Sequence, residues 1–407
     1  MTGATLRVID PAQAAPRDRQ LMQRAARLAL RGHGGAEPNP MVGCAIADDR
    51  GRVIGEGFHR RCGEAHAERA ALDDLRRRGF EPAAARGSTL FVTLEPCAGS
   101  GRTPPCCDAI IASGVARVVM ARRDPHEKGS GGADRLLAAG IAVELLPEPA
   151  AVAVSDSFVH RVVTGLPWCC AKWAQTIDGR IATRSGESRW ISSARSRAFV
   201  HRERGRVDAI VTGIGTALAD DPKLTARGVR RRRIARRVVI DPMLRLPISS
   251  ALLATLDSAP LTIAVSAEQV AEPRRREFLE QVCGIMPPAA AGAAIEIVTL
   301  PPFVGGSGAS LDLRVLWRHL VDAHAVSTIL VEAGPRTVRT LIEQDLLEEA
   351  LVFIAPILIG DQQARACVEG MGGDAMGISH LADATRFALA DLRRRGGDVM
   401  ARWRRVR

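Results

Sequence analysis

The chain has 407 residues, of which 46% are hydrophobic and 25% charged, and it carries a formal net charge of +11. This balance is typical of globular domains and excludes a collagen-like or wholly disordered chain, while the length predicts two or three domains. No apolar run approaches the ~20 residues of a membrane-spanning helix, and no basic segment followed by an apolar one opens the chain, so we expect neither a membrane partner nor a secretory signal.

The first part of the chain predicts a layered α/β domain over residues 1–150. Apolar residues recur at helical spacing in some segments and form short apolar runs in others. We expect helices over 18–31, 66–78, 105–113 and 132–139, and strands over 41–47, 53–58, 88–94, 117–121 and 141–146. Strands that alternate with helices indicate a sheet covered by helices. Residues 151–166 are expected to form a helical linker.

Residues 167–407 restart the α/β pattern and predict a second domain. The expected strands are 168–175, 207–212, 236–241, 261–265, 295–299, 328–332, 349–356 and 398–406, with helices over 194–204, 311–322 and 335–345. No internal repeat relates the two halves, so we interpret them as two different domains.

The excess of positive charge is concentrated partly in one run, from Arg227 to Arg237. A basic balance favours anionic partners, including nucleic acid and phosphorylated metabolites. The run contains no aromatic residue and no recognition-helix pattern, so we interpret it as a solvated loop. The whole chain has five Trp, nine Phe and no Tyr, so surfaces for stacking bases are scarce. We therefore expect no nucleic-acid partner.

The chain has nine cysteines. An odd number without a visible signal peptide predicts reduced thiols in the cytoplasm and not a disulfide framework. Most of them are expected to be small buried hydrophobic residues.

Two of the cysteines belong to a pattern with the chemistry of a zinc site. His66 opens a predicted helix, Cys97 follows a strand, and Cys106 begins the next helix. One imidazole and two thiolates suit a tetrahedral Zn²⁺, and three protein ligands leave a fourth position for water, as in catalytic sites. Glu68 lies two residues beyond His66 and could carry protons without binding the metal. The alternative is that His66 caps a helix and the cysteines, like Cys107, only fill the core.

Three motifs around this pattern resemble the deaminase half of the bifunctional riboflavin-biosynthesis deaminase/reductase family. They are Pro38-Asn39-Pro40-Met41-Val42-Gly43, His66-Ala67-Glu68, and Thr93-Leu94-Glu95-Pro96-Cys97 followed by Gly101-Arg102-Thr103-Pro104-Pro105-Cys106. The wide P-C-x8-C spacing is specific, because most cytidine and tRNA adenosine deaminases carry P-C-x-x-C. The resemblance implies a cytidine-deaminase-like fold and the following roles: zinc ligands His66, Cys97 and Cys106, proton shuttle Glu68, and pyrimidine contact Asn39.

The second half resembles the reductase domain of the same family, which has a dihydrofolate-reductase-like fold and uses NADPH. The strand–glycine–helix junction around Gly334 offers free backbone N–H groups to a phosphate, whereas Gly213-x-Gly215 is not a Rossmann fingerprint. The resemblance implies substrate contacts at Lys172, Ser188, Arg204, Leu224, Arg227 and Glu332. It implies NADPH contacts at Trp190, Thr216, Asp220, Gly334, Pro335, Arg336, Thr337, Val338, Arg339 and Thr340.

We therefore predict a zinc-dependent pyrimidine deaminase joined to an NADPH-dependent reductase, acting on a phosphorylated pyrimidine and forming a homo-oligomer through the reductase domain. Two hypotheses from other classes stay open: a nucleic-acid base deaminase with an unrelated second domain, and a chain that keeps only one activity. The low aromatic content and the cysteine spacing argue against the first. The second rests on departures from the family pattern at positions 65, 98–100, 126–127 and 357.

Overall fold

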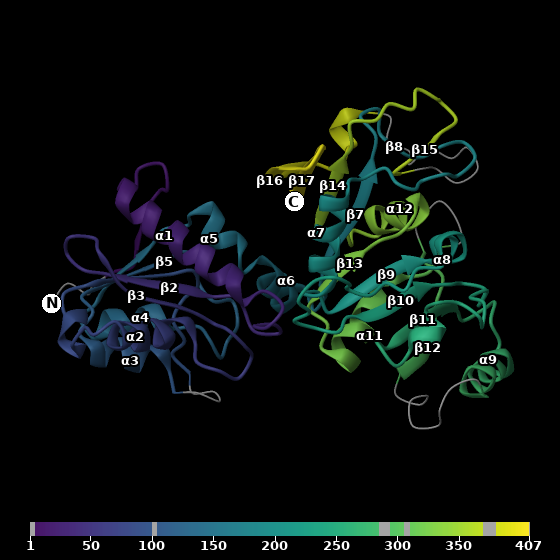
Figure 1. The fold of residues 1–407 in the computed structure, drawn as a ribbon. Coiled ribbons are helices and arrows are strands. Elements are labelled where there is room, and N and C mark those ends of the chain that lie inside the picture. The colour runs from purple at the N-terminus through teal and green to yellow at the C-terminus, as the bar shows by residue number, and fades with distance from the viewer. Residues whose placement is uncertain (1–4, 100–103, 285–293, 305–309, 369–379, 407) are drawn as a thin grey trace. The chain divides into compact units, whose positions relative to one another are not determined.

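The computed structural model describes residues 5–99, 104–284, 294–304, 310–368 and 380–406. The chain divides into two compact units, Met1–Gly165 and Leu166–Arg407, whose helices and strands are labelled in Figure 1. Within the described ranges, none of the helices combines the length and the apolar character needed to cross a bilayer.

In its described part, the first unit is a six-stranded sheet between two layers of helices. Its strands are β1 (Arg7–Val8), β2 (Gly43–Ala47), β3 (Val53–Phe58), β4 (Thr89–Val92), β5 (Arg117–Met120) and β6 (Ala142–Leu145). Its helices are α1 (Pro16–Ala29), α2 (Ala67–Arg77), α3 (Cys106–Ser113), α4 (Gly132–Ala138), α5 (Pro149–Ala153) and α6 (Asp156–Thr164). The strand order is β1-β6-β5-β4-β2-β3, and β2 is antiparallel to both of its neighbours.

Helices α2, α3 and α4 cover one face of this sheet, and α1 and α5 cover the other (Figure 1). Successive side chains of a strand point to opposite faces. In β4, Leu90 and Val92 enter the core beneath α2 and α3, whereas Phe91 enters the core beneath α1. Because both faces are covered, Leu90, Phe91 and Val92 are all buried, which explains the short apolar run in the sequence.

Residues 151–165, predicted as part of a linker, group with the first unit. Ala151 and Val154 are buried in the core that α1 covers. Arg161 of α6 donates a hydrogen bond to the carbonyl oxygen of Pro38 at 3.0 Å. The helical pattern of this segment is visible in the sequence, but the surface that it packs against is not.

The second unit contains, in its described part, a nine-stranded sheet and a two-stranded one. The strands are β7 (Trp168–Gln175), β8 (Arg180–Ala182), β9 (Ala209–Gly213), β10 (Arg236–Ile240), β11 (Leu261–Ser266), β12 (Ile295–Leu300), β13 (Thr328–Val331), β14 (Glu349–Ile354), β15 (Arg365–Ala366), β16 (Phe387–Arg395) and β17 (Asp398–Arg405). The helices are α7 (Ala194–Arg204), α8 (Ile214–Asp220), α9 (Glu272–Gly284), α11 (Leu313–His324) and α12 (Pro335–Glu343).

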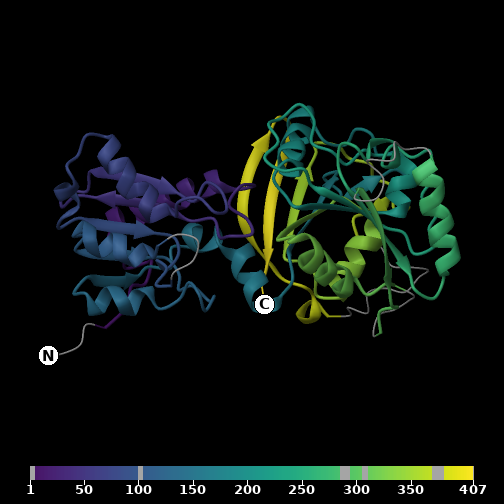
Figure 2. The ribbon, with the colours of Figure 1, turned by 90° about the horizontal axis from the view of Figure 1, so that it is seen from below.

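The large sheet has the order β12-β11-β10-β9-β13-β7-β14-β17-β16. The strands from β12 to β14 are parallel, and β17 and β16 are antiparallel additions beside β14, drawn in yellow in Figure 2. Side chains of α7, α8 and α9 pack into one core of this unit, and those of α11 and α12 pack into a second.

A topological switch point lies between β9 and β13, which are adjacent and parallel. The chain leaves β9 through α8 and returns in β10, on the side away from β13. It leaves β13 through α12 and returns in β14, in the opposite direction, beyond β7. Ligands of open α/β sheets bind outside the carboxyl ends of strands at such a point, so this edge is the expected place for a cofactor.

The sequence pattern misses helices α8 and α9, strand β16 and the short strands β1, β8 and β15. Helix α9 buries only Phe278 and Val282, and the side chains of β16 are mostly exposed, so neither segment shows a clear apolar period.

The interpretation of the arginine run as a solvated loop is wrong at its end, because Arg237 lies in β10 and is fully buried. Its guanidinium donates to the hydroxyl of Thr255 at 2.7 Å, and burial lowers the pKa of Arg237 to about 10.

Candidate active sites

The three predicted zinc ligands come together in the first unit, two of them at helix starts and Cys97 in the loop after β4. His66 immediately precedes α2, and Cys106 is the first residue of α3. The Nδ1 atom of His66 lies 3.6 Å from the sulfur of Cys97 and 3.3 Å from that of Cys106. One nitrogen and two sulfurs are donors that zinc prefers, and all three lie within 4.8 Å of one another. The donor set therefore fits a Zn²⁺ ion.

The electrostatics of the cluster favour a bound cation. The pKa of Cys97 is lowered because the Cys106 thiol donates a hydrogen bond to its sulfur and because His66 lies beside it. The backbone N–H of Cys106 also donates to the Cys97 sulfur at 3.3 Å. Thiolate is the metal-binding form of cysteine, so Cys97 is prepared to bind a metal.

Glu68 lies in the first turn of α2 and is 4% exposed. Burial raises the pKa of its carboxyl group, although the neighbouring His66 opposes the shift. A carboxyl group with a raised pKa can both accept and release a proton near neutral pH. The position and environment of Glu68 therefore fit the predicted proton shuttle.

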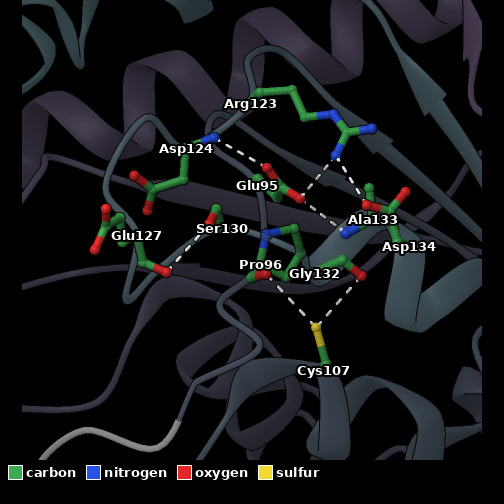
Figure 3. A network of polar contacts seen from close by, with 10 residues as sticks. All are labelled: Glu95, Pro96, Cys107, Arg123, Asp124, Glu127, Ser130, Gly132, Ala133 and Asp134. Carbon is green, nitrogen blue, oxygen red and sulfur yellow. Dashed lines mark hydrogen bonds and ion pairs between the residues drawn. The ribbon is translucent and has the colours of Figure 1, made fainter.

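A buried carboxylate supports the loop that carries Cys97, as Figure 3 shows. The side chain of Glu95 is fully buried and accepts backbone hydrogen bonds from Asp124 at 3.0 Å and Ala133 at 2.9 Å. Arg123 contacts the same carboxylate at 3.4 Å. Glu95 thus ties the segment before the predicted metal ligand Cys97 to the loop after β5 and to the start of α4.

Cys107 takes part in the same support and not in the metal cluster. Its sulfur lies 3.5 Å from the carbonyl oxygen of Pro96 and 3.6 Å from that of Gly132 (Figure 3). A Cβ atom at position 132 would lie 1.7 Å from the Pro96 oxygen, so only glycine allows this approach. The expected structural role of Cys107 agrees with these contacts.

The structure adds one residue to this site that the sequence pattern did not reveal. His59 is 2% exposed, and its ring lies edge-on to His66 with centroids 5.4 Å apart. Its Nε2 atom lies 3.2 Å from the side-chain nitrogen of Asn39, the predicted pyrimidine contact, and its Nδ1 atom 3.1 Å from the carbonyl of Ala65. The only sequence signal was a histidine seven residues before His66. Ser100 and Gly101–Thr103 of the family motif lie outside the described residues.

In the second unit, three predicted substrate contacts meet at one carboxylate. Glu332 follows β13, Lys172 lies in β7, and Arg204 ends α7. The Nε and Nη2 atoms of Arg204 lie 2.5 and 3.0 Å from the two Glu332 oxygens, and Lys172 Nζ lies 3.5 Å from one of them. Two positive charges against one negative charge leave the cluster net positive.

The pKa of Glu332 is strongly lowered. Burial works to raise its pKa, but the charges of Arg204 and Lys172 outweigh this effect and hold the pKa at about 2. The carboxylate is therefore ionised at neutral pH, and it keeps both cations in place.

The other predicted substrate residues are less closely joined. Leu224 is buried with a φ of +50°, and the carbonyl of the next residue, Thr225, accepts from Arg204 at 3.4 Å. Arg227 is exposed, and its backbone N–H donates to the ring of His201 at 3.3 Å. Ser188 is exposed, and no contact joins it to this cluster among those the structure describes.

Several predicted NADPH contacts meet at the switch point, where two helices begin side by side. Gly213 precedes α8 and Gly334 precedes α12. A Cβ atom at Gly213 would lie 2.8 Å from the hydroxyl of Thr337, and one at Gly334 would lie 3.7 Å from that of Thr216. Two adjacent helix N-termini present backbone N–H groups that suit a phosphate.

The remaining NADPH candidates are more scattered. Trp190 is 68% exposed and stacks with Arg197 at 4.5 Å. Asp220 accepts hydrogen bonds from Arg189. Arg189 was not among the predicted contacts. Within α12, Arg336 is exposed, Pro335 and Thr340 are half-buried, and Val338 and Arg339 are buried. Burial of these last two side chains leaves only their backbone for a cofactor contact.

Comparison with known proteins covers both units. Residues 15–122 match the model of the cytidine and deoxycytidylate deaminase zinc-binding region, and residues 167–401 match the RibD C-terminal domain. The riboflavin biosynthesis protein RibD of Escherichia coli (strain K12) is 37% identical over 389 residues, which are 94% of this chain and 98% of that protein. The RibD of Aquifex aeolicus is 32% identical over 95% of this chain and 98% of its own length.

Solved structures give the same result. RibD of Acinetobacter baumannii superposes with a TM-score of 0.73 at 31% identity and covers 96% of this chain and 99% of its own. A deaminase/reductase of Thermotoga maritima, described as acting on diaminohydroxyphosphoribosylaminopyrimidine and 5-amino-6-(5-phosphoribosylamino)uracil, superposes with a TM-score of 0.75 at 28% identity and the same coverage. These matches confirm the predicted fold class, the deaminase and reductase domains, and the cofactors Zn²⁺ and NADPH. The chain belongs to the RibD family of bifunctional riboflavin biosynthesis proteins.

Proposed function

We propose that this chain catalyses two consecutive reactions of riboflavin biosynthesis. The first unit hydrolyses the 2-amino group of 2,5-diamino-6-ribosylamino-4(3H)-pyrimidinone 5′-phosphate, and the second reduces the ribosyl group of 5-amino-6-(5-phosphoribosylamino)uracil with NADPH. The observation that carries this proposal is the arrangement of the first site, where the donors of His66, Cys97 and Cys106 come together and the buried carboxyl group of Glu68 interacts with all three residues.

In the deaminase, His66, Cys97 and Cys106 would hold the zinc ion. When bound, zinc supplies positive charge that lowers the pKa of a water molecule. Glu68 takes a proton from that water at its carboxylate oxygen and delivers it to the departing amino nitrogen. The water oxygen would add to the ring carbon first, and the C–N bond would break once the amino nitrogen has received the proton, so that ammonia leaves. Asn39, oriented by His59, holds the pyrimidine against this carboxylate.

In the reductase, NADPH supplies the hydride that reduces C1′ of the ribosyl group. The two helix N-termini at Gly213 and Gly334 bind the cofactor phosphates through backbone N–H groups. Glu332 fixes Lys172 and Arg204, and the net positive charge of these three residues attracts the phosphorylated substrate. Arg227, which is exposed, is free to reach the ribose phosphate, since a guanidinium binds phosphate in bidentate geometry. Positioning of this kind supplies much of the acceleration.

A coupled assay tests both reactions. Zinc-loaded protein is mixed with the phosphorylated diaminopyrimidine and NADPH, and ammonia and NADPH absorbance are followed together. We expect NADPH oxidation to begin only as ammonia is released and to yield the ribitylamino product. Ammonia without NADPH oxidation would contradict the reductase assignment and favour a chain with one activity. Absence of both signals would contradict the proposal as a whole.

We also propose that the chain associates through its reductase unit in the cytoplasm. Strand β16 lies at one edge of the large sheet and exposes Leu389 and Leu392 at 49% and 58%, and an open strand edge is a template for pairing with another chain. All nine cysteines are free, which suits a reducing compartment. Light scattering of wild type and Leu392→Asp tests the association, with a monomeric wild type as the contradicting result.

A further inference from the structure

A second group of metal-binding side chains lies in the second unit, away from the predicted site. Glu296 on β12 faces His319 and His324 of α11, and the donor atoms of these residues lie within 4.8 Å of one another. Glu296 is the second residue of β12, so the group lies toward the amino ends of the parallel strands. The predicted NADPH contacts lie at the carboxyl ends, after β9 and β13. The group is therefore no part of the reductase site.

We propose that Glu296, His319 and His324 bind a divalent transition-metal ion such as Zn²⁺. Two imidazole nitrogens and one carboxylate oxygen form an established ligand set for zinc and its neighbours. Three protein ligands leave a further position for water. The side chains are 28%, 33% and 22% exposed, so an ion can reach them from solvent.

The distances resemble those of the first cluster. The Nε2 atom of His319 lies 3.3 Å from one Glu296 oxygen, and the Nε2 atom of His324 lies 2.8 Å from the other. In the first cluster, the two sulfurs lie 3.3 and 3.6 Å from the imidazole nitrogen of His66. Both histidines present the same type of nitrogen to one carboxylate, with ring centroids 5.7 Å apart. Small side-chain movements would open the space for an ion.

Neighbouring strands hold the carboxylate in place. Thr262 of β11 pairs with Glu296 in the sheet register, and its hydroxyl donates to Oε1 at 2.6 Å. Arg236 of β10 donates to the same oxygen at 3.2 Å. Carboxylates that bind metals are commonly oriented by such hydrogen bonds. Since Thr262 and Arg236 both bind Oε1, Oε2 remains as the oxygen best placed for a metal.

The same neighbours keep Glu296 ionised. Burial acts to raise the pKa of Glu296, but hydrogen bonds from Thr262 and His324 and the charge of Arg236 lower it below its ordinary value. Arg236 also repels a cation, so we expect weaker binding here than at the cysteine-containing site. A bound ion would join edge strand β12 to α11 and would stabilise the second unit, because a ligand that binds only the folded state favours folding.

The competing explanation is a purely ionic network, in which the two histidines donate protons to Glu296 and no metal binds. The number of metal ions bound per chain distinguishes the metal site from the ionic network. Full-length protein is stripped with a chelator and dialysed against micromolar Zn²⁺, and zinc per chain is measured by mass spectrometry. We expect two ions in wild type and in the control His380→Ala, an exposed histidine outside both clusters. We expect one ion in the double variant His319→Ala/His324→Ala.

Two further measurements keep the test decisive. His324→Gln retains a hydrogen-bond donor toward Glu296 and is measured in case the double variant fails to fold; it is also expected to bind one ion. In Co²⁺-loaded protein, the second ion should add visible absorption without the sulfur-to-cobalt charge-transfer band of the first. One ion in wild type, or two ions in both the double variant and His324→Gln, would overturn the proposal. Neither result depends on the deaminase or the reductase being active.

Discussion

The two candidate active sites are built in different ways. In the first unit, the predicted metal ligands are side chains of specialised chemistry, separated by 31 and 9 positions, whose donor atoms lie within 4.8 Å. In the second unit, the charged cluster joins Glu332 to residues 128 and 160 positions away, and the NADPH contacts depend on backbone N–H groups at two helix starts.

This difference shows what each site depends on. The first depends on the identity of a few side chains and on the loops that hold them. The second depends on the order of strands, because the switch point between β9 and β13 places its helix ends side by side. Single substitutions at the first site should therefore reduce its activity directly. At the second site they should reduce activity mainly by destabilising the fold.

Replacement of Glu68 should give the largest effect. Glu68→Gln keeps the size of the side chain but removes the group that moves the proton, so ammonia release should fall by about 10²–10⁴-fold. Reduction of the deaminated intermediate by the same variant should remain at the wild-type rate. The matched control is Glu64→Gln, since Glu64 is an exposed residue close in sequence. Equal losses of both activities in Glu68→Gln would contradict the separation of the sites.

Replacement of Glu332 should affect the second site through both activity and stability. Glu332→Gln leaves Arg204 and Lys172 without their partner, and unpaired buried charge costs about 3–5 kcal/mol of unfolding free energy. Displacement of the two cations should lower the reductase rate by about 10²-fold. Denaturant unfolding and NADPH oxidation measure the two effects, and the exposed residue Glu268 supplies the control Glu268→Gln. A reductase with wild-type rate would show that the cluster is not part of the site.

The loop beside Cys97 offers a test of how strongly the first site depends on its support. A methyl group in Gly132→Ala would overlap the Pro96 oxygen and shift the segment that carries the predicted metal ligand Cys97. Changes in residues that support a metal ligand lower metal affinity or activity by about 10–100-fold. Zinc affinity should fall while reductase activity is retained. At Gly284 an added Cβ atom meets no neighbour among the residues that the structure describes, so the control Gly284→Ala should change neither zinc affinity nor reductase activity.

Acid pH should weaken the second unit through Glu332. The pKa of Glu332 is about 2 in the folded chain and about 4.5 in its ordinary state. The stabilisation is therefore fully present above pH ~4.5 and is lost as the pH falls toward 2, with a size of about 3 kcal/mol. Unfolding free energies measured between pH 6 and 3 should fall less steeply in Glu332→Gln. Identical slopes for wild type and variant would contradict the charge assignment.

Much of this arrangement could be predicted from local sequence patterns. Central strands such as β4, β9 and β13 contain short buried apolar runs, because helices cover both faces of each sheet. Elements with little buried surface, such as α9 and β16, leave no such pattern and were missed. His59 was missed for another reason: a single histidine has no spacing partner in the sequence, and its contact with Asn39 across 20 positions exists only in the folded chain.

The sequence by itself determined the α/β layering and the presence of a zinc-type donor set, and it predicted Glu68 as the proton shuttle, since these depend on residue type and on spacing along short segments. Only the tertiary structure decided which charges meet. It placed Glu332 between Lys172 and Arg204, buried Arg237 in a strand, and brought Glu296 to two histidines of another element. These contacts join residues far apart in the chain, and strand order and register, which local patterns do not encode, set their distances.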